Sequence, residues 1–361
     1  MATQSRANLH LLRLAVSMLR MSFRGVALVL SLLPTSLLAQ QTLLPLWPHA
    51  LPQPAQTDAP EADTTTRDDG FISGHRTARL TNIAHPTITV YAPPPGQNTH
   101  SAALVFPGGG YNVLAWNGEG TDTCDWLNRL GMTCILVKYR VPEKGHFPVN
   151  PADLEDAQQA MRLTRAHAAE WHIDPNKIGV IGFSAGGNLA TLLSLYPDDH
   201  TVEKTPAAPD VDTTIDARPN FAMLVYPAYL AVDPDQTALD PVYTPSATTP
   251  RTFIVAAEND TSYGKNSLVY YRALVDAQRP AELHMYPNGG HGFGMYPTGA
   301  AAHWTGVAAE WLRGIHILPP PPPPPPNLPA NGSPQSPPPC VTYVPPPPGS
   351  PATTTPDPNC I

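Results

Sequence analysis

Short apolar runs alternate with segments of helical periodicity through the middle of the chain. The apolar runs have the length of strands that are buried on both faces of a sheet. They predict strands over Thr87–Tyr91, Ala102–Phe106, Thr133–Tyr139, Ile178–Phe183, Phe221–Tyr226, Thr252–Ala257 and Ala281–Tyr286. The segments between them predict helices over Glu119–Leu130, Asp153–Trp171, Leu189–Leu195, Ser267–Ala277 and Gly299–Trp311. This alternation predicts an α/β fold with a mostly parallel central sheet and helices on both faces.

The first 39 residues have the build of an export signal. Several arginines precede Gly25–Ala39, a mostly apolar run that is short and interrupted by Pro34. We expect cleavage after Ala39 and no stable membrane insertion once the signal is removed. The protein should then be exported, to the periplasm or out of the cell. Met21 is a second candidate for the start, because it would give a signal of more usual length.

The regions on either side of the predicted domain differ from it in composition. Residues 40–83 are rich in Pro, Thr, Asp and Gln, and they predict an irregular lead-in. Many of the 47 prolines lie in residues 319–361, which predict a disordered, extended Pro-rich tail that cannot bury a core. Such a tail could act as a spacer, or as a ligand that contacts another protein or the cell envelope. The folded domain should therefore occupy residues 84–318.

Charge and cysteine content narrow the classes of partner. The 361 residues carry a formal net charge of -8, which argues against nucleic acid as a partner. The four cysteines form two sets, Cys124 with Cys134 and Cys340 with Cys360, and each set could pair in an oxidising compartment. Two buried thiols explain the first set equally well. No cysteine has the spacing of a metal ligand, so we expect no structural zinc.

The strongest chemical signal is the stretch Gly182–Gly186, which follows a buried strand and precedes a helix. It fits the G-x-S-x-G pattern of a nucleophile elbow, with Ser184 as the nucleophile. A serine on such a strained turn is exposed, and its neighbours must be small. The backbone N–H of Ala185 then lies at a helix N-terminus, where negative charge is stabilised.

A second glycine-rich stretch, Pro107–Tyr111, follows the predicted strand Ala102–Phe106. A flexible turn would also use glycine, but the spacing to Ser184 matches the loop that completes an oxyanion hole in this type of serine hydrolase. We expect the backbone N–H groups of Gly109 or Gly110 to point at a developing oxyanion.

The serine needs a base, and in this fold the acid and then the histidine follow it along the chain. His291 lies among glycines just after the last predicted strand, from where a loop can reach the serine. His284 lies within a strand, and His303 and His316 lie on or after the closing helix, so His291 is the predicted base.

The acid should follow the predicted strand Thr252–Ala257. Asp260 and Glu258 both have a suitable position, and Asp260 is preferred because it lies further into the loop. Asp235 and Asp240 lie in the preceding long loop and are weaker candidates. A triad of this kind transfers an acyl group to water through an acyl-enzyme, and it requires no metal or cofactor.

Several motifs together resemble a bacterial group of esterases in the α/β-hydrolase superfamily, which includes acetyl-xylan and feruloyl esterase-like enzymes and is also called dienelactone-hydrolase-like. The resemblance covers roughly residues 84–311. The motifs are Pro107–Tyr111, Trp116–Gly120, Lys138–Arg140, Gly182–Gly187, Asn259–Asp260 and Gly289–Gly294. The resemblance implies the α/β-hydrolase fold, serine esterase activity and acyl substrates linked to carbohydrate. It also implies a triad of Ser184, Asp260 and His291, with Gly109, Gly110 and Ala185 in the oxyanion hole.

The leading hypothesis is therefore an exported serine carboxylesterase that removes small acyl groups, with acetyl groups on carbohydrate as candidate substrates. A serine peptidase of the same fold is a second hypothesis. A third is a non-catalytic surface-binding protein that works through its Pro-rich tail, since a fold alone does not establish a function.

Overall fold

The computed structural model describes residues 41–66, 71–72, 74–143, 147–198, 210–232 and 234–321, and the backbone of 341–344 and 353–356. The predicted export signal, Cys340 and Cys360 lie outside these residues. The chain divides into two compact units between Leu318 and Pro319.

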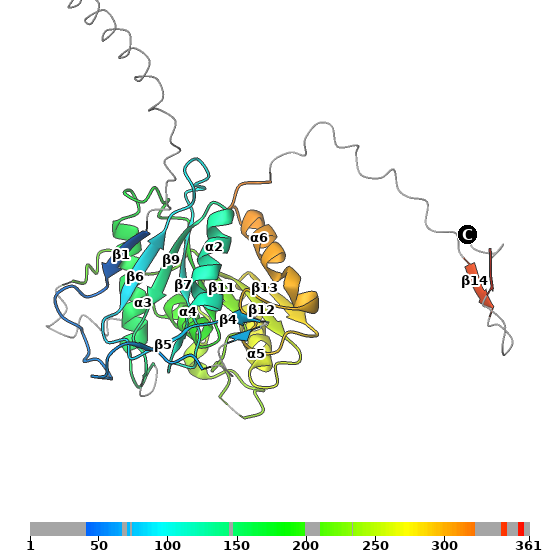
Figure 1. Ribbon diagram of the computed structural model, residues 1–361, viewed down its shortest axis with the longest axis horizontal. Helices are drawn as coiled ribbons and strands as arrows, with labels where there is room; N and C mark the ends of the chain where they lie inside the picture. The colour runs from blue at the N-terminus through cyan, green and yellow to red at the C-terminus, as the bar shows by residue number, and fades with distance from the viewer. Residues whose placement is uncertain are drawn as a thin grey trace, which may run out of the picture. The chain divides into compact units, whose positions relative to one another are not determined.

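An eight-stranded sheet forms the centre of the first unit (Figure 1). Strand β6 is antiparallel to both of its neighbours, β1 and β9, and all the other neighbouring strands are parallel. The order across the sheet is β1 (Gln41–Pro45), β6 (Thr87–Tyr91), β9 (Thr133–Lys138), β7 (Ala102–Phe106), β10 (Ile178–Phe183), β11 (Phe221–Val225), β12 (Arg251–Ala257) and β13 (Ala281–Tyr286).

Helices cover both faces of the sheet because its central strands are apolar on both faces. On β7, Leu104 and Phe106 belong to one hydrophobic cluster, whereas Ala103 and Val105 belong to the other. The first cluster is closed by α3 (Ala152–Ala166), α4 (Ala185–Leu195) and α5 (Gly264–Asp276), and the second by α2 (Asp122–Arg129) and α6 (Trp304–Gly314). The predicted α/β fold with a mostly parallel sheet is therefore confirmed. Among the described residues, no helix is long and apolar enough to cross a membrane.

The lead-in contradicts the expectation of irregular structure over residues 40–83. Gln41–Pro45 forms β1 and pairs with β6 at the edge of the main sheet. The next two residues, Leu46 and Trp47, are buried, and the Trp47 indole N–H donates to Asp156 on α3 at 2.7 Å. The folded domain therefore begins at β1 and not at residue 84.

The rest of the lead-in contributes small strands beside the main sheet. One sheet joins β2 (Ala62–Asp63), β5 (Arg79–Thr81) and β8 (Leu114–Ala115), and another joins β3 (Phe71–Ile72) and β4 (His75–Arg76). We call strands β2 to β5 the lead-in arm. Strand β5 pairs with β8, and β8 follows the glycine-rich stretch closely in the chain, so the lead-in arm lies near that stretch.

The helices start and end at slightly different residues from those predicted. A π-helical turn, η1 (Asn117–Thr121), precedes α2, and helix α3 ends at Ala166, since turns replace the helix over 167–172. Helix α4 begins directly after Ser184. Short 3₁₀ turns form η2 (Pro241–Tyr243) and η3 (Gly299–His303).

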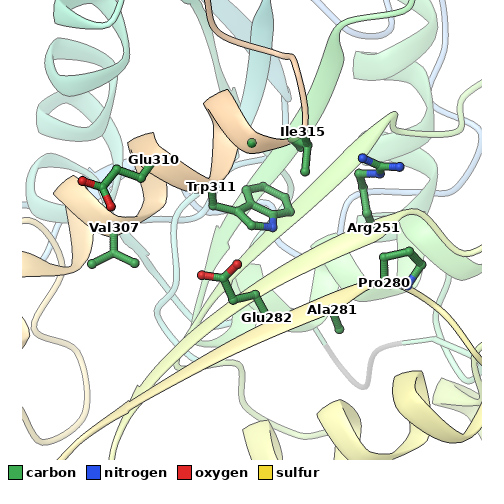
Figure 2. Close-up of a pocket in the computed structure, with 9 residues that line it drawn as sticks. Arg251, Pro280, Ala281, Glu282, Val307, Glu310, Trp311 and Ile315 are labelled. Carbon is green, nitrogen blue, oxygen red and sulfur yellow. The ribbon is translucent and has the colours of Figure 1, made fainter. Parts of the chain in front are cut away.

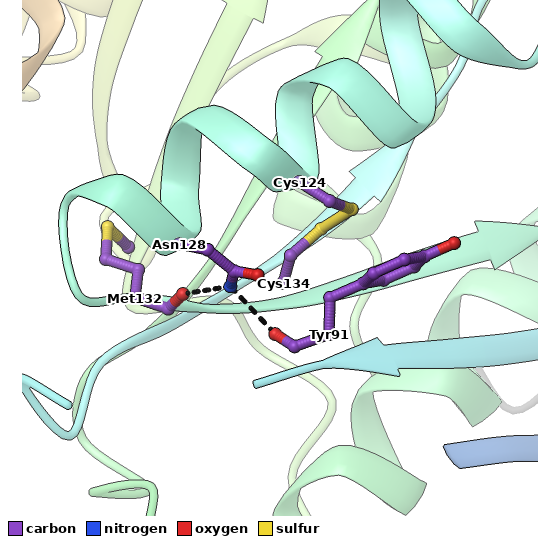
Figure 3. Close-up of a disulfide and its surroundings, with 5 residues drawn as sticks. All are labelled: Tyr91, Cys124, Asn128, Met132 and Cys134. Carbon is purple, nitrogen blue, oxygen red and sulfur yellow. Dashed lines mark hydrogen bonds between the residues drawn. A yellow bond between two sulfur atoms is a disulfide. The ribbon is translucent and has the colours of Figure 1, made fainter. Parts of the chain in front are cut away.

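A disulfide joins Cys124 on α2 to Cys134 on β9 (Figure 3). Beside it, the Asn128 side-chain amide donates to the carbonyl oxygens of Tyr91 and Met132, each at 2.9 Å. Helix α2 is thus held to β9 by a covalent link, and by hydrogen bonds to the end of β6 and to the residue before β9. Of the two alternatives open for this cysteine set, the structure has the disulfide.

In the second unit, β14 (Val341–Val344) and β15 (Thr353–Pro356) pair antiparallel, with Val341 opposite Pro356. The Pro-rich composition gave no indication of this pair of strands. The remaining tail residues from 322 onward lie outside the described part of the chain.

Candidate active site

The candidate site lies where the parallel strands end. The carboxyl ends of β7, β10, β11, β12 and β13 meet at one edge of the sheet, and each is followed by a residue of the site or of its support. Three segments are central, and we name them the glycine loop (Pro107–Tyr111), the elbow (Gly182–Gly187) and the histidine loop (Asn288–Gly294). A ligand at this edge can be reached by side chains from several strands at once.

Ser184 has the backbone of a strained elbow. Its φ of 52° and ψ of -116° are unusual for a residue other than glycine. A Cβ atom on Gly182 would lie 2.0 Å from the carbonyl oxygen of Gly186. A Cβ on Gly186 would lie 2.0 Å from the carbonyl oxygen of Phe106. Both flanking glycines are therefore required by backbone contacts, which explains the pattern around the serine.

The structure brings Ser184, His291 and Asp260 into one hydrogen-bonded chain. Ser184 Oγ lies 2.7 Å from His291 Nε2, and His291 Nδ1 lies 2.7 Å from Asp260 Oδ2. An ionised carboxylate only accepts hydrogen bonds, so Nδ1 carries a proton and donates to Asp260. In the neutral ring Nε2 is then the acceptor, and it faces the serine hydroxyl.

Asp260 is held as an anion. Burial acts to raise its pKa, but the hydrogen bond and charge of His291 and the backbone N–H groups of Tyr263 and Ser262 outweigh burial, so the pKa lies below its ordinary value. Both N–H groups donate to Oδ1, at 3.0 and 3.1 Å, while Oδ2 accepts from the histidine. The acid is thus fixed in orientation as well as in charge.

The alternative candidates lie elsewhere. Glu258 is exposed and lines a separate hollow, which Asp260 also lines. His284 is on β13, and its Nε2 lies 2.6 Å from Glu282 Oε1. His303 ends η3, and His316 follows α6.

The glycine loop approaches the serine from β7. Gly109 and Gly110 have φ values of 132° and 63°, and a Cβ on Gly109 would lie 2.1 Å from the carbonyl oxygen of Val113. Ala185 is the first residue of α4, so its N–H has no acceptor within the helix. The structure therefore brings Gly109 and Gly110 to the hollow that also contains Ser184, with Ala185 next to the serine in the chain.

Two residues of the site were missed in the sequence. Glu119 on η1 is 3% exposed and accepts from the Gly108 N–H at 2.7 Å and from the Tyr226 hydroxyl at 2.8 Å. The Tyr226 oxygen in turn accepts from the Gly294 N–H at 2.7 Å. Burial raises the pKa of Glu119, although these two bonds and the nearby His291 act in the opposite direction. The only available signal was the placement of Glu119 within the motif Trp116–Gly120.

The hollow over the serine has a volume of about 380 Å³. Its walls come from the lead-in arm, the glycine loop, the histidine loop and two tyrosines. The lining residues are Ile72, Thr77, Arg79, Gly109, Gly110, Val113, Ala115, Glu119, Ser184, Tyr229, Tyr263, His291 and Gly292. The Tyr263 ring also lies 4.8 Å from the His291 ring, centre to centre, so it packs against the histidine as well as lining the hollow.

Another hollow, of about 490 Å³, lies at the opposite ends of the strands (Figure 2). It is formed by the start of β12 and β13 together with α6, and its charged side chains are Arg251, Glu282 and Glu310. Neither a serine nor a histidine lines it, so it lacks the nucleophile and the base of a serine hydrolase. Among the described residues, no group of three or more His, Cys, Asp or Glu side chains could hold a metal ion.

Comparison with known proteins extends these observations. The family model described as BD-FAE matches residues 88–223. An acetylxylan esterase from Xylanibacter ruminicola is 31% identical over 225 residues, which cover 55% of this chain and 42% of that protein. A probable carboxylic ester hydrolase, LipM, from Mycobacterium tuberculosis is 28% identical over 243 residues, which cover 59% of this chain and 54% of that protein. The chain spans roughly half or less of the length of such curated relatives.

A solved structure is similar over its whole length. The acetyl ester-xyloside bifunctional hydrolase from Caldicellulosiruptor lactoaceticus is 29% identical, with a TM-score of 0.58, over 79% of this chain and 100% of that one. The fold and the elbow define the class, and they are those of the α/β-hydrolase superfamily. Within that superfamily its relatives include the acetylxylan esterase and the ester hydrolases named above, so the resemblance to this esterase group is confirmed.

Proposed function

We propose that the protein is a serine carboxylesterase that hydrolyses short-chain acyl esters. The observation that carries this proposal is the unbroken chain from Ser184 Oγ through His291 to Asp260, with 2.7 Å at each step. The relatives named as carboxylic ester hydrolases support the same class of reaction.

In this reaction His291 Nε2 takes the hydroxyl proton while Ser184 Oγ forms a bond to the carbonyl carbon of the ester. The carbonyl electron pair moves onto its oxygen and forms an oxyanion. Collapse of this intermediate breaks the ester C–O bond, and the imidazolium gives its proton to the departing alkoxide. A water molecule then repeats the sequence on the acyl-enzyme and releases the acid. Asp260 holds the tautomer of His291 and stabilises the imidazolium in both halves.

The oxyanion would be bound by the backbone N–H groups of Ala185 and of Gly109 or Gly110. Groups of this kind stabilise the charge that develops in the transition state, and removing one typically slows the reaction by about 10²–10³-fold. The close contacts that exclude a Cβ at Gly109 support a loop that is set in place before the substrate arrives.

We infer acetyl groups on carbohydrate as the substrate. The relatives named as an acetylxylan esterase and an acetyl ester-xyloside hydrolase support this choice. The rings of Tyr229 and Tyr263 line the hollow and offer apolar surface with a polar edge, which suits a sugar next to a small acyl group.

We also propose that the protein is exported, to the periplasm or out of the cell. The composition of residues 1–39 supports this, and so does the Cys124–Cys134 disulfide, because disulfides persist in oxidising compartments. N-terminal sequencing of the protein recovered outside the cytoplasm should begin at Gln40, and recovery of an uncleaved chain from the cytoplasm alone would contradict export.

The esterase activity is tested by comparing Ser184→Ala with Ser194→Ala on p-nitrophenyl acetate. Ser194 lies on α4, the helix that begins directly after Ser184, and its hydroxyl donates to the Ala190 carbonyl at 2.7 Å. We expect Ser184→Ala to lower kcat by at least about 10⁴-fold, and Ser194→Ala to retain nearly full activity. Equal activity of wild type and Ser184→Ala would refute the assignment of the nucleophile.

A substrate panel separates this proposal from a peptidase of the same fold. Acetylated xylan, feruloylated sugars, short and long acyl esters and peptide amides should be compared at equal enzyme concentration. We expect the highest kcat/KM among the acetyl and other short acyl esters, with acetylated xylan included among them. Preferential cleavage of peptide amides would replace the esterase with the peptidase.

A further inference from the structure

Glu119 is a buried carboxyl group that the reaction above does not use. Its two oxygens accept from donors on different segments, Oε2 from the Gly108 N–H and Oε1 from the Tyr226 hydroxyl. Burying a carboxylate is costly unless it is well bonded, and bonds to an ionised acceptor are the stronger kind. A buried acid in this position therefore needs a role to explain it.

The two backbone donors of this network, the N–H groups of Gly108 and Gly294, belong to the two loops that serve the serine. A Cβ on Gly108 would lie 2.8 Å from the Cβ of Ser184, so Gly108 lies directly against the nucleophile. Gly294 is in the histidine loop, three residues after His291, and its N–H donates to Tyr226. One continuous path of hydrogen bonds thus runs from the glycine loop to the histidine loop through Glu119 and Tyr226.

The sheet itself cannot make this connection. The glycine loop follows β7 and the histidine loop follows β13, and three strands, β10, β11 and β12, lie between them. Backbone pairing within the sheet therefore does not fix one loop against the other. Tyr226 directly follows the middle one of those three strands, and Glu119 reaches it from η1.

A further contact supports the same connection. Met295, which follows the histidine loop, donates its N–H to the carbonyl oxygen of Gly118 at 3.0 Å. A Cβ on Gly294 would lie 2.7 Å from that same oxygen. The η1 turn that carries Glu119 is therefore packed against the backbone just after the histidine loop, with no room for a side chain.

We propose that Glu119 is a positioning residue that couples the glycine loop to the histidine loop. The role in catalysis rests on the proposed esterase function. The Gly108 N–H is occupied by the carboxylate, which fixes the turn from which Gly109 and Gly110 face the hollow. Tyr226 hydrogen-bonds to both Glu119 and the Gly294 N–H, so it also restrains the loop that carries His291. Substrate would thus meet both halves of the site in one fixed arrangement.

The test uses Glu119→Gln and Tyr226→Phe in the full-length protein, with Tyr270→Phe as a matched buried tyrosine on α5. Glutamine has one acceptor oxygen in place of two, so it cannot accept from both the Gly108 N–H and the Tyr226 hydroxyl. Tyr226→Phe removes the hydroxyl but leaves the bond between Gly108 and Glu119. Two quantities are measured, the hydrogen-exchange rates of the Gly108 and Gly294 amides, and kcat and KM for p-nitrophenyl acetate.

We expect Glu119→Gln to speed exchange at both amides by about tenfold. It should lower kcat by about 10²-fold with KM changed less than about threefold, as for a displaced catalytic group. Tyr226→Phe should speed exchange mainly at Gly294, and Tyr270→Phe should change neither quantity.

Unchanged exchange at both amides in Glu119→Gln would overturn the coupling. Faster exchange with unchanged kcat in an active enzyme would overturn the positioning role. If the wild type hydrolyses no ester, the proposed function fails, and the exchange rates still decide whether Glu119 couples the loops. If Glu119→Gln does not fold, Tyr226→Phe decides through the Gly294 amide.

Discussion

The elbow and the histidine loop are both rich in glycine, yet they use it differently. In the elbow a Cβ on Gly182 or Gly186 would lie 2.0 Å from a backbone oxygen, so close contact demands glycine. In the histidine loop Gly290 and Gly292 have φ values of 67° and 77°, and a Cβ on either would have nothing within 4 Å. At these two positions the backbone conformation alone favours glycine, whereas a Cβ on Gly294, at the end of the loop, would lie 2.7 Å from the Gly118 carbonyl oxygen.

The two segments are therefore held by different forces. Steric contact between rigid backbone segments fixes the nucleophile. Hydrogen bonds hold the histidine loop, where Asn259 accepts from the Gly290 N–H at 2.8 Å and Asp260 accepts from His291. The comparison teaches that hydrogen bonds rather than steric contact place the base, and that its placement depends on Asn259 and Asp260 in the loop after β12.

The largest effect is expected from Asp260→Asn, which removes the charge that orients the base. The Asn side chain can present its amide to His291 Nδ1 and favour the wrong tautomer. We expect kcat for p-nitrophenyl acetate to fall by about 10⁴-fold with the fold intact, as measured by steady-state kinetics and circular dichroism. A loss below about tenfold would mean that another group orients His291.

The next largest effect is expected from Gly186→Ala, which tests whether steric contact between backbone segments fixes the elbow. The new methyl group would meet the Phe106 carbonyl, and neither backbone segment can move easily. We expect the free energy of unfolding to fall by about 3 kcal/mol or more, at the upper end for overpacking. Chemical denaturation measures it, and a change under about 1 kcal/mol would show that the elbow is not rigid.

Removing the disulfide provides a control away from both segments. Cys124→Ser with Cys134→Ser opens a short loop, with a sequence separation of 10, that α2 and β9 close. The chain-entropy model gives a loss of roughly 2–3 kcal/mol in the free energy of unfolding. Esterase activity at 25 °C should remain close to wild type, so a large loss of kcat would show that stability and activity are not separable in these assays.

A smaller effect is expected from Gly292→Ala, the matched change in the histidine loop. The methyl group meets open space, so only the strain of a positive φ remains, which costs about 1 kcal/mol. We expect a decrease of a few-fold in kcat. If Gly292→Ala lowered the free energy of unfolding as much as Gly186→Ala does in chemical denaturation, the distinction between the two uses of glycine would be wrong.

The smallest effect is the pH dependence of stability through Asp260. Its pKa in the folded protein lies below the ordinary value of 3.8. Ionised Asp260 therefore stabilises the fold above that value, and this contribution is lost as the pH falls through the lower, folded pKa. Denaturation at several pH values should show wild type losing stability relative to Asp260→Asn over this acid range. A constant difference across the range would contradict the lowered pKa.

Local pattern was enough to predict the central fold. The apolar runs that became β7, β10 and β11 are buried at every residue, so their character was visible without tertiary context. Strand β1 was missed because Gln41–Pro45 is only partly buried and ends in proline, which resembles a loop. Its pairing with β6 is a long-range contact that composition does not encode.

The residues of the candidate site also differ in whether a local sequence pattern could predict them. Ser184 and His291 lie in glycine-rich settings with a sequence pattern, so both were predicted. Glu119 and Tyr226 act through contacts between η1 and the ends of β7 and β11. Tyr226 carries no pattern of its own, and Glu119 has only its place in the motif Trp116–Gly120. Supporting residues of this kind become visible only when separate loops are placed side by side.

The most direct test of the central claim is the site of covalent labelling by a fluorophosphonate probe. This reagent phosphonylates a serine that an adjacent base has activated. After digestion, mass spectrometry should find one label, on the peptide that contains Ser184, in wild type and in Ser194→Ala. Labelling should be absent in Ser184→Ala and strongly slowed in Asp260→Asn. A label that persists in Ser184→Ala, or one that lies on a different residue, would contradict this account.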